Sequence, residues 1–394
     1  MASETAGRKK MSRASKRTGE HAAAKPKQKR FDTAFLIIIL ILLAYGVIMV
    51  FSASYPAALQ KTGNSLHFIS QHVLFVLAGI AAMLLISRID YHFYRRFAYI
   101  IFGVALLLLI LVAIPGVGRV LNNARRWIYI GPIGFQPSEI MKFAVIVLFS
   151  HLIAHYQKRM GTFKKGVLPF AVVLLVIAVL MMLEPHLSGT ILIFGIGCIM
   201  MYIGGTKLRY FLAIGGLGVG AIAGIIAFKG VSYITERLQF WLNPFADIND
   251  KTWQTVQSLV AIGSGGLLGR GIGASRQKYL YLPEPYNDFI FAIICEELGL
   301  IGALFVILLF VLFAVRGFSI ASKAPDRFGF MLATGITVQI CLQAVLNIAV
   351  VTNTIPNTGI SLPFFSYGGT AIMMQLGEMG ILLNISRHAF MEKT

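Results

Sequence analysis

Long apolar runs alternate with shorter polar segments along most of the chain. The runs are continuous and lack the alternation of every second residue that marks a strand of a membrane β-barrel, and about twenty helical residues cross the hydrocarbon core of a bilayer. A helix also satisfies its own backbone hydrogen bonds in lipid. The pattern therefore predicts an all-α, polytopic membrane protein with about ten transmembrane helices. The expected spans are residues 33–53, 68–87, 98–114, 138–156, 167–184, 188–204, 210–229, 288–315, 328–352 and 367–386.

The composition agrees with a membrane protein. Hydrophobic residues make up 57% of the 394 positions and charged residues only 13%, and the mean hydropathy is +0.76. The formal net charge is nevertheless +19 at pH 7. Such a charge can indicate nucleic-acid binding, but most of it lies in one terminal tail and in short loops, where membrane orientation and anionic lipid headgroups account for it. We therefore expect contact with membrane lipids and no nucleic-acid partner.

The distribution of Lys and Arg predicts the orientation in the membrane. Residues 1–31 hold ten of these cations and no apolar run, so this segment is expected to be a disordered, basic, cytoplasmic tail. The loops after even-numbered spans are also basic, which places both termini on the cytoplasmic side of the inner membrane. The expected membrane domain is 32–387, followed by a short cytoplasmic C-terminus at 388–394. The basic loop residues are Arg88, Arg95, Arg96, Lys158, Arg159, Lys164, Lys165, Lys207, Arg209, Arg316, Lys323 and Arg327.

Two outward connections are long, residues 115–137 and 230–287. The second, between the seventh and eighth spans, is expected to be one large extracellular loop, and long ordered loops on a membrane scaffold usually carry function. Both contain cations on the side where the orientation rule does not require them. An anionic substrate at the outer face would explain these cations, and so would contacts with lipid phosphates or loop carboxylates; the sequence leaves both explanations open. The cations are Arg119, Arg125, Arg126, Arg237, Lys251, Arg270, Arg276 and Lys278.

Asp288 lies where the second long loop meets the eighth span. Ionisable groups are costly in hydrocarbon and usually persist beside a cavity, a partner or a substrate, so Asp288 is a candidate for chemistry at a membrane surface. An Asp after a Pro-rich turn is also a good helix N-cap. Glu139 and Lys142 lie three residues apart on one helical face and can pair. They either line a substrate cavity or form a structural contact between helices.

The cysteines and glycines indicate no bound cofactor. Cys198, Cys295 and Cys341 fall inside apolar spans without paired spacing, which favours neither disulfides nor a metal cluster. The glycine-rich stretch 263–273 has no preceding strand and no Gly-Lys-Ser/Thr ending, so no nucleotide is expected. Its backbone amides could contact phosphate or sugar, or its glycines could allow close helix packing, and both alternatives stay open.

Six sequence blocks occur in an order that resembles the SEDS family of peptidoglycan glycosyltransferases. The resemblance covers nearly the whole chain after residue 31, and six blocks in order make it highly specific. The first span and the first block look closer to the cell-division branch of that family than to its elongation or sporulation branches. Position 186 carries His where the family commonly has Asp, which argues against an essential acid there. The blocks are Asn122-Asn-Ala-Arg-Arg-Trp-Ile128; Gln136-Pro-Ser-Glu-Ile-Met-Lys142; Glu184-Pro-His-Leu-Ser-Gly-Thr190; Gly263-Ser-Gly-Gly-Leu-Leu-Gly-Arg-Gly-Ile-Gly273; Leu282-Pro-Glu284 with Asp288-Phe-Ile-Phe-Ala292 and Glu296-Glu-Leu-Gly299; and Ser361-Leu-Pro-Phe-Phe-Ser-Tyr-Gly-Gly-Thr370.

The resemblance implies a reaction and a set of residues. Members of this family polymerise lipid II: the 4-hydroxyl of an acceptor N-acetylglucosamine attacks C1 of a donor N-acetylmuramic acid, and undecaprenyl pyrophosphate leaves. Asp288 matches the family's catalytic aspartate and would act as the general base. A divalent cation, Mg²⁺ or Mn²⁺, could share the stabilisation of the leaving pyrophosphate. The residues expected to bind substrate are Arg125, to a lesser degree Arg126, and Gln136, Glu139, Lys142, Arg270, Lys278, Glu284 and Ser366.

The resemblance also implies partners and a location. A class B penicillin-binding protein would supply transpeptidase activity, and other divisome proteins would join it at the division septum. Two other function classes stay in view, a lipid II flippase and a scaffold for division proteins. The chain shows no internal repeat of the kind that many transporters have, which disfavours a flippase. A scaffold would explain the basic tail but not Asp288 beside outward cations.

Overall fold

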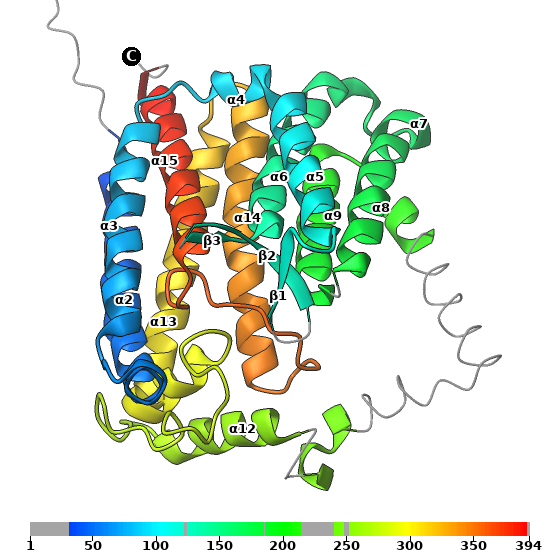
Figure 1. The fold of residues 1–394 in the computed structure, drawn as a ribbon. Helices are drawn as coiled ribbons and strands as arrows, with labels where there is room; N and C mark the ends of the chain where they lie inside the picture. Colours follow the sequence, from blue (N-terminus) through cyan, green and yellow to red (C-terminus); the bar gives the residue numbers. More distant parts are fainter. Residues whose placement is uncertain are drawn as a thin grey trace, which may run out of the picture. The chain divides into compact units, whose positions relative to one another are not determined.

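The computed structural model describes residues 31–121, 124–131, 133–184, 186–213, 240–247 and 252–391. The predicted basic tail, apart from its last residue, and most of the predicted seventh span lie outside these residues. The described residues from Phe31 onward belong to one compact unit. The helices in this unit (Figure 1) are α2 Thr33–Thr62, α3 His67–Ile86, α4 His92–Arg96, α5 Ala98–Ala113, α6 Pro137–His155, α7 Phe163–Gly166, α8 Leu168–Leu183, α9 Leu187–Gly204, α12 Trp253–Gly265, α13 Ile290–Ser322, α14 Arg327–Val351 and α15 Gly369–Met391, with short 3₁₀ turns η1 Gln157–Arg159 and η2 Pro244–Asp247.

The helices confirm a multi-pass membrane fold. Among the described residues, seven helices are long and apolar enough to cross a membrane: α2, α3, α6, the continuous segment Phe163–Leu183, α9, α13 and α14. Helix α5 is apolar but has only 16 residues, and α15 is not among the seven. The expected total of ten spans and the side on which each terminus lies stay predictions.

Helix α2 shows how local sequence determines an element. It begins after Asp32, whose carboxylate accepts a hydrogen bond from the Phe35 backbone N–H at 2.9 Å. It ends at Gly63, which takes a left-handed conformation with φ 68°, as helix C-caps commonly do. The helix therefore extends to Thr62, well beyond the expected end of the first span at residue 53. Its last turns reach the end of the bundle where Asp288 lies, because Lys61 Nζ donates to the hydroxyl of Tyr286 at 3.3 Å.

The expectation of an all-α chain needs one correction. The connection between α5 and α6 forms a three-stranded antiparallel sheet, with β1 Gly118–Leu121, β2 Ala124–Ile130 and β3 Ile133–Phe135 in the order β1-β2-β3. The β-branched and aromatic side chains of β2 favour a strand. The sheet is too short to show in hydropathy patterns, which indicated only a long loop. Strand β2 packs on α5 and α6, and β3 packs on α15, so the sheet lies against the bundle (Figure 1).

The described part of the predicted loop 230–287 contains regular structure that the sequence did not predict. It contains helix α12, which packs along α13 and runs crosswise to the long helices (Figure 1). Trp253 Nε1 donates to the carbonyl of Tyr281 at 2.7 Å, and Ser258 Oγ donates to the carbonyl of Val351 at 2.8 Å. These bonds connect α12 both to the segment that precedes Asp288 and to the end of α14.

Helix α13 is broken at Gly299, and the glycine-rich loop after α12 fills the break. Gly299 has φ 66° and ψ −165°, a conformation open almost only to glycine. The break leaves the carbonyls of Glu296 and Glu297 and the N–H groups of Leu300 and Ile301 without their helical partners. Loop backbone groups replace all four: Arg270 N to Glu296 O at 3.0 Å, Gly271 N to Glu297 O at 2.9 Å, Leu300 N to Gly266 O at 2.9 Å and Ile301 N to Leu267 O at 3.2 Å.

These contacts decide between the two explanations of the glycine-rich stretch. A Cβ atom added at Gly269 would lie 2.2 Å from the carbonyl oxygen of Glu297, and one added at Gly265 would meet the carbonyl of Cys295. Glycine is needed here because two backbones approach closely. The contacts favour the packing alternative, and the amides of Arg270 and Gly271 are already donated to α13.

The predicted basic loops share one end of the bundle. Arg95 lies 3.7 Å from Asp326, before α14, and Arg327 Nη2 approaches the carbonyl of Ile203, near the end of α9, at 3.4 Å. Thr206 Oγ1 donates to the carbonyl of Gly166 at 3.0 Å, which joins the same end of α9 to α7. Asp288 lies at the opposite end, beside the end of α2 and the start of α3. This clustering agrees with the charge rule that predicted a cytoplasmic face.

Gly299 provides a test of the helix break. We expect Gly299→Val to destabilise the protein by about 2–3 kcal/mol or more, because Val cannot adopt this backbone conformation and its Cβ would lie 2.4 Å from the backbone nitrogen of Gly269. The change is measured as a shift in the thermal unfolding of the purified protein. Unfolding is monitored through the reaction of a thiol dye with Cys295, which is buried in the folded state. Gly263→Ala in α12 is the matched control, since a Cβ there meets nothing within 4 Å and should be neutral or mildly stabilising. Equal melting temperatures for the two variants would contradict this account.

Candidate functional site

Asp288 lies two residues before the start of α13, and the backbone carbonyls of residues 286–288 each accept a hydrogen bond from α14 or from the loop before α15. Asn347 Nδ2, from α14, donates to the carbonyl of Asp288 at 2.7 Å. Ser366 Oγ donates to the carbonyl of Asn287 at 2.7 Å, and the backbone N–H of Tyr367 donates to the carbonyl of Tyr286 at 2.8 Å. The residue preceding the helix is Phe289, and no side chain caps it. The N-cap explanation for Asp288 is therefore not supported, and its carboxyl group is available for other contacts.

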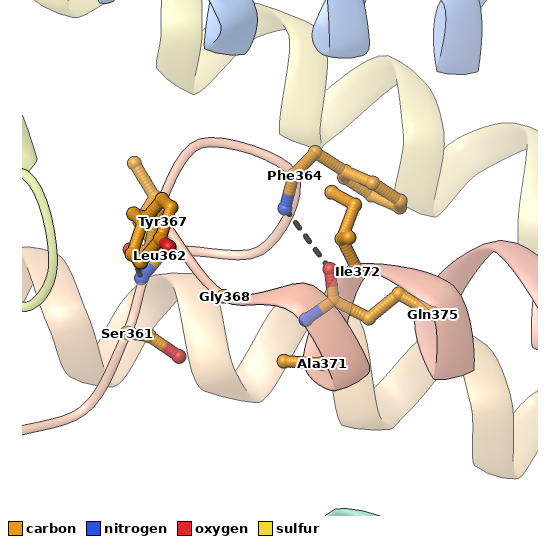
Figure 2. Close-up of a pocket in the computed structure, with 9 residues that line it drawn as sticks. Ser361, Leu362, Phe364, Tyr367, Gly368, Ala371, Ile372 and Gln375 are labelled. Carbon is orange, nitrogen blue, oxygen red and sulfur yellow. Dashed lines mark hydrogen bonds between the residues drawn. The ribbon is translucent and has the colours of Figure 1, made fainter. Parts of the chain in front are cut away.

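The loop before α15 is shaped to pass close to that carboxyl group. Gly359 has φ 67°, and a Cβ atom added there would lie 3.1 Å from Asp288 Oδ2. Asn347 Nδ2 also donates to the carbonyl of Ile360 at 2.6 Å, so one amide joins both segments. Further along, Phe364 has φ 66°, and its N–H donates to Gln375 Oε1 of α15 at 3.0 Å beside a small pocket (Figure 2). A left-handed conformation at a residue other than glycine costs about 1–3 kcal/mol, so surrounding contacts must enforce it.

The positive charge of Arg126 interacts with the carboxyl group of Asp288. In the sheet, Arg119 pairs with Trp127 and Val120 pairs with Arg125, which makes Arg126 the extra residue of a bulge in β2. Bulges re-aim side chains and are frequent beside active sites. The half-buried guanidinium interacts electrostatically with Asp288 and also with Glu184, while burial lowers its pKa. Arg126 therefore acts on the proposed site through its charge, and the order of Arg125 and Arg126 in substrate binding stays a prediction.

The pKa of Asp288 is raised to about 6. Burial is the largest cause, the negative charge of Glu284 adds to it, and the positive charge of Arg126 opposes both. Glu284 is itself positioned by a hydrogen bond of 2.6 Å from Asn287 Nδ2, with a left-handed φ of 51°. A carboxyl group with a pKa near 6 is ionised at neutral pH and still basic enough to accept a proton, as a general base requires.

Glu139 and Lys142 of α6 form the predicted ion pair, with 2.8 Å between Glu139 Oε2 and Lys142 Nζ. The Lys142 ammonium also donates to Gln343 Oε1 at 3.0 Å, and Gln343 Nε2 donates to the carbonyl of Ser361 at 3.0 Å. These bonds lead from α6 through α14 to the loop that passes Asp288. Gln136, at the start of α6, is partly exposed and makes no capping bond. Substrate contact by these residues stays a prediction.

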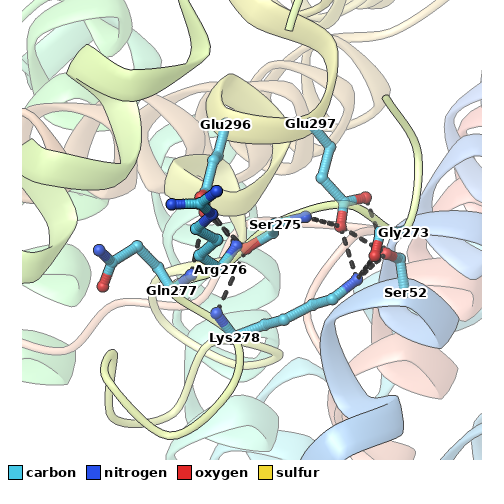
Figure 3. A network of polar contacts seen from close by, with 8 residues as sticks. All are labelled: Ser52, Gly273, Ser275, Arg276, Gln277, Lys278, Glu296 and Glu297. Carbon is cyan, nitrogen blue, oxygen red and sulfur yellow. Dashed lines mark hydrogen bonds and ion pairs between the residues drawn. The ribbon is translucent and has the colours of Figure 1, made fainter. Parts of the chain in front are cut away.

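Lys278, by contrast, lies in a buried polar network (Figure 3). Its side chain is 3% exposed, and Nζ contacts Glu297 Oε1 at 2.8 Å, Ser52 Oγ at 3.1 Å and the carbonyl of Gly273 at 2.7 Å. Removing one member of a buried pair typically costs about 3–5 kcal/mol, so this contact anchors the loop to α2 and α13. Arg270 is exposed and its Nε donates to the carbonyl of Ser264 at 3.2 Å. Pyrophosphate binding by either cation stays a prediction, and for Lys278 the contacts favour anchoring.

Ser275 and Lys278 have the Ser-x-x-Lys spacing of penicillin-binding transpeptidases, a match that sequence reasoning overlooked. The structure assigns the motif another use. Ser275 is 1% exposed and its hydroxyl donates to Glu296 Oε2, while the Lys278 ammonium is directed to Glu297 instead (Figure 3). The serine is neither accessible nor activated as a nucleophile, so this motif does not support transpeptidase activity.

Several site residues were given no role from sequence. Glu184 lies in one of the six sequence blocks, but the block does not indicate its role. Its link to Asp288 is Arg126, which interacts electrostatically with both acids. Asn347 and Gly359 act through hydrogen bonding and close approach, which no sequence pattern marks. The buried His186 immediately precedes α9 within the same block as Glu184, and burial lowers its pKa to about 3, so its imidazole is neutral.

Together these features define a multi-pass helical membrane protein with an acid and an arginine in a polar site at one end of its bundle. A family described as "Cell cycle protein", which groups FtsW, RodA and SpoVE, matches residues 32–390. The chain belongs to this family. Stage V sporulation protein E of Bacillus subtilis is 40% identical over 91% of this chain and 97% of its own length. "Probable peptidoglycan glycosyltransferase FtsW" of Geobacter sulfurreducens is 38% identical over 91% and 95%.

Solved structures show the same fold. A chain in a structure titled "Structural coordination of polymerization and crosslinking by a peptidoglycan synthase complex" superposes with a TM-score of 0.76, at 22% identity, over 91% of this chain and 98% of that one. The rod shape determining protein RodA of Thermus thermophilus gives a TM-score of 0.67 at 22% identity, over 93% and 99%. Because sporulation and division relatives have similar identities, identity alone does not separate the branches of the family.

The arrangement of charges around Asp288 leads to a prediction about its ionisation. Glu284→Gln should lower the pKa of Asp288 from about 6, since it removes a negative charge that disfavours ionisation, and Arg126→Gln should raise it. The carboxyl stretch in infrared difference spectra, assigned by its loss in Asp288→Asn, measures each value. Asp90→Asn, at the other end of the bundle, is the control and should leave the pKa unchanged. Shifts in the same direction for the two site variants would refute the arrangement.

Proposed function

We propose that this protein is a peptidoglycan glycosyltransferase that polymerises lipid II on the outer face of the cytoplasmic membrane. The observation that carries the proposal is the placement of Asp288, an acid in a family block. Its segment is held by hydrogen bonds from α14 and from the loop before α15, its pKa is near 6, and the guanidinium of Arg126 acts on it. FtsW relatives are named as glycosyltransferases of this kind. Their names and this geometry together favour an enzyme over a flippase or a scaffold.

The proposed mechanism is a single inverting displacement. The Asp288 carboxylate accepts the proton of the acceptor 4-hydroxyl as that oxygen forms a bond to C1 of the donor. The bond between C1 and the diphosphate oxygen breaks, and undecaprenyl pyrophosphate leaves with its electron pair. Arg126 is positioned to stabilise the negative charge that develops on the diphosphate. The proton then passes from Asp288 to water.

The other predicted substrate residues fall into two groups. The first group stays as proposed substrate contacts: Lys142 and Glu139 on α6, Gln136 just before it, Arg125 on β2, and Arg270 and Lys278 in the segment between α12 and α13. Glu284 and Ser366 act on Asp288 through charge and backbone hydrogen bonding, so we assign them positioning roles.

A divalent cation would share the stabilisation of the leaving group. Among the described residues, no cluster of three or more His, Cys, Asp or Glu could hold a metal ion. No nucleotide has a place in the proposed reaction.

The proposed partner is a class B penicillin-binding protein that supplies the transpeptidase, with other divisome proteins at the septum. The structural relative that superposes with a TM-score of 0.76 comes from a complex whose title names polymerisation and crosslinking together, which supports such a partner. The cell-division role follows the branch that the first span and first block resemble.

Replacing the proposed base tests this function directly. We expect Asp288→Asn to abolish lipid II polymerisation, with a loss of about 10²–10⁴-fold, because the amide is nearly isosteric but cannot accept the proton. Glycan products are measured on gels with purified protein, partner and Mg²⁺ or Mn²⁺, and an unchanged melting temperature shows that the variant is folded. Retention of more than a few per cent of activity would remove Asp288 from the role of base.

The arginine pair yields a second prediction. Arg126→Ala should weaken lipid II binding about tenfold or more, since hydrogen bonds to charged groups contribute roughly 1.5–3 kcal/mol. Arg125→Ala, the matched control on the neighbouring residue, should have a smaller effect. Binding is measured at two salt concentrations to separate specific contacts from general attraction. Unchanged affinity in both variants would favour the explanation that these cations contact lipid headgroups.

A further inference from the structure

Glu184 is a buried acid that the proposed mechanism does not use. It follows the last residue of α8, its side chain is 1% exposed, and its Oε1 atom has no hydrogen-bond partner among the described residues. Buried polar atoms are nearly always paired, because leaving one unpaired costs free energy. An unpaired carboxyl oxygen next to a proposed substrate site therefore indicates a missing partner.

Among the described residues, Arg126 is the charged group that acts on Glu184. Arg126 interacts electrostatically with both Glu184 and Asp288, so one guanidinium serves two carboxyl groups. Lys142, whose charge acts on the neighbouring His186, is already paired with Glu139 at 2.8 Å. His186 is buried beside Arg126 and Lys142, whose charges add to the effect of burial and keep its imidazole neutral. Two ionised carboxylates here would leave an uncompensated negative charge where an anionic substrate is to bind.

Glu184 and Asp288 have different environments, which give their carboxyl groups different pKa values. Burial raises the pKa of Glu184 to about 8, and Arg126 only partly opposes this. Asp288, with a pKa of about 6, is then ionised at neutral pH while Glu184 keeps its proton. Two carboxyls with separated pKa values commonly take different roles in one site. A protonated carboxyl group can donate a hydrogen bond, which an ionised one cannot.

We propose that Glu184 is a further substrate-binding residue, whose carboxyl group donates a hydrogen bond to an anionic oxygen of the lipid-linked diphosphate beside Arg126. The neutral carboxyl group of Glu184 and the cationic guanidinium of Arg126 would then bind the same diphosphate. The assignment rests on the proposed function, since lipid II supplies that diphosphate. It also explains how an acid can occupy an anion-binding site without repelling the anion.

The test is the pH dependence of lipid II binding. Lipid II is a suitable probe because its diphosphate is a diester and does not titrate near neutral pH. With the wild-type protein in nanodiscs, affinity should fall about tenfold between pH 7 and pH 9 as Glu184 ionises. Glu184→Gln should weaken binding at pH 7 by no more than about threefold, because an amide still donates, and should remove the decline. Glu184→Ala should weaken binding about tenfold or more at pH 7.

The outcomes separate this inference from the proposed function. An unchanged decline in Glu184→Gln would assign the titration to another group, and wild-type affinity in Glu184→Ala would show that no contact exists; either result overturns the inference. A Gln variant as weak as the Ala variant would mean that the ionised acid is required, which also overturns it. Asp90→Asn controls for nonspecific charge effects. Normal, pH-dependent binding without any glycan product would instead contradict the proposed function and leave the role of Glu184 in binding supported.

Discussion

The Asp288 site depends on one constraint: the backbone N–H and carbonyl groups freed by the break in α13 must find hydrogen-bond partners. A helix that crosses a membrane cannot leave its carbonyl and N–H groups unpaired, since each costs several kcal/mol in hydrocarbon. At Gly299 the four freed groups are paired by the glycine-rich loop, which must therefore lie against α13. The two carboxylates just before the break, Glu296 and Glu297, then bind Ser275 and Lys278, which lie between the glycine-rich loop and Asp288 (Figure 3). The break thus determines the course of the chain that leads to Asp288.

The Asp288 site is preorganised by contacts from elements that are distant in sequence. Asn347 joins the segment before α13 to the loop before α15, and Ser366 joins the same two segments from the other side. Side chains held in this way lose little freedom when substrate binds, which favours catalysis by positioning. The bulged strand contributes Arg126, and the turn between α8 and α9 contributes Glu184. Burial and charge act differently on the two acids, so the pKa of Glu184 is raised to about 8 and that of Asp288 to about 6.

The sequence was informative where one local pattern determines the outcome. Continuous apolar runs predicted the helices, and spacing along α6 predicted the Glu139–Lys142 pair. Grouping of the basic loops at one end also agreed with the charge rule. The helix break could not be predicted, because residues 288–315 look like one apolar run and the partner of Gly299 lies in a different segment. The ion pair of Lys278 with Glu297 could not be predicted either, because the two residues lie in different segments, and Lys278 was therefore expected to bind pyrophosphate. The electrostatic association of Glu184, Arg126 and Asp288 joins three separate sequence blocks, so no single block indicates it.

We propose that glycan polymerisation takes place at the Asp288 end of the bundle, on the outer face of the membrane. The most direct measurement supplies lipid II only to the leaflet of proteoliposomes that faces this end, with no transmembrane gradient, and follows both glycan length and the leaflet distribution of lipid II. With a competent partner and a divalent cation present, this account predicts polymer formation while lipid II stays in the supplied leaflet. Translocation of intact lipid II without any polymer would contradict it and favour a flippase.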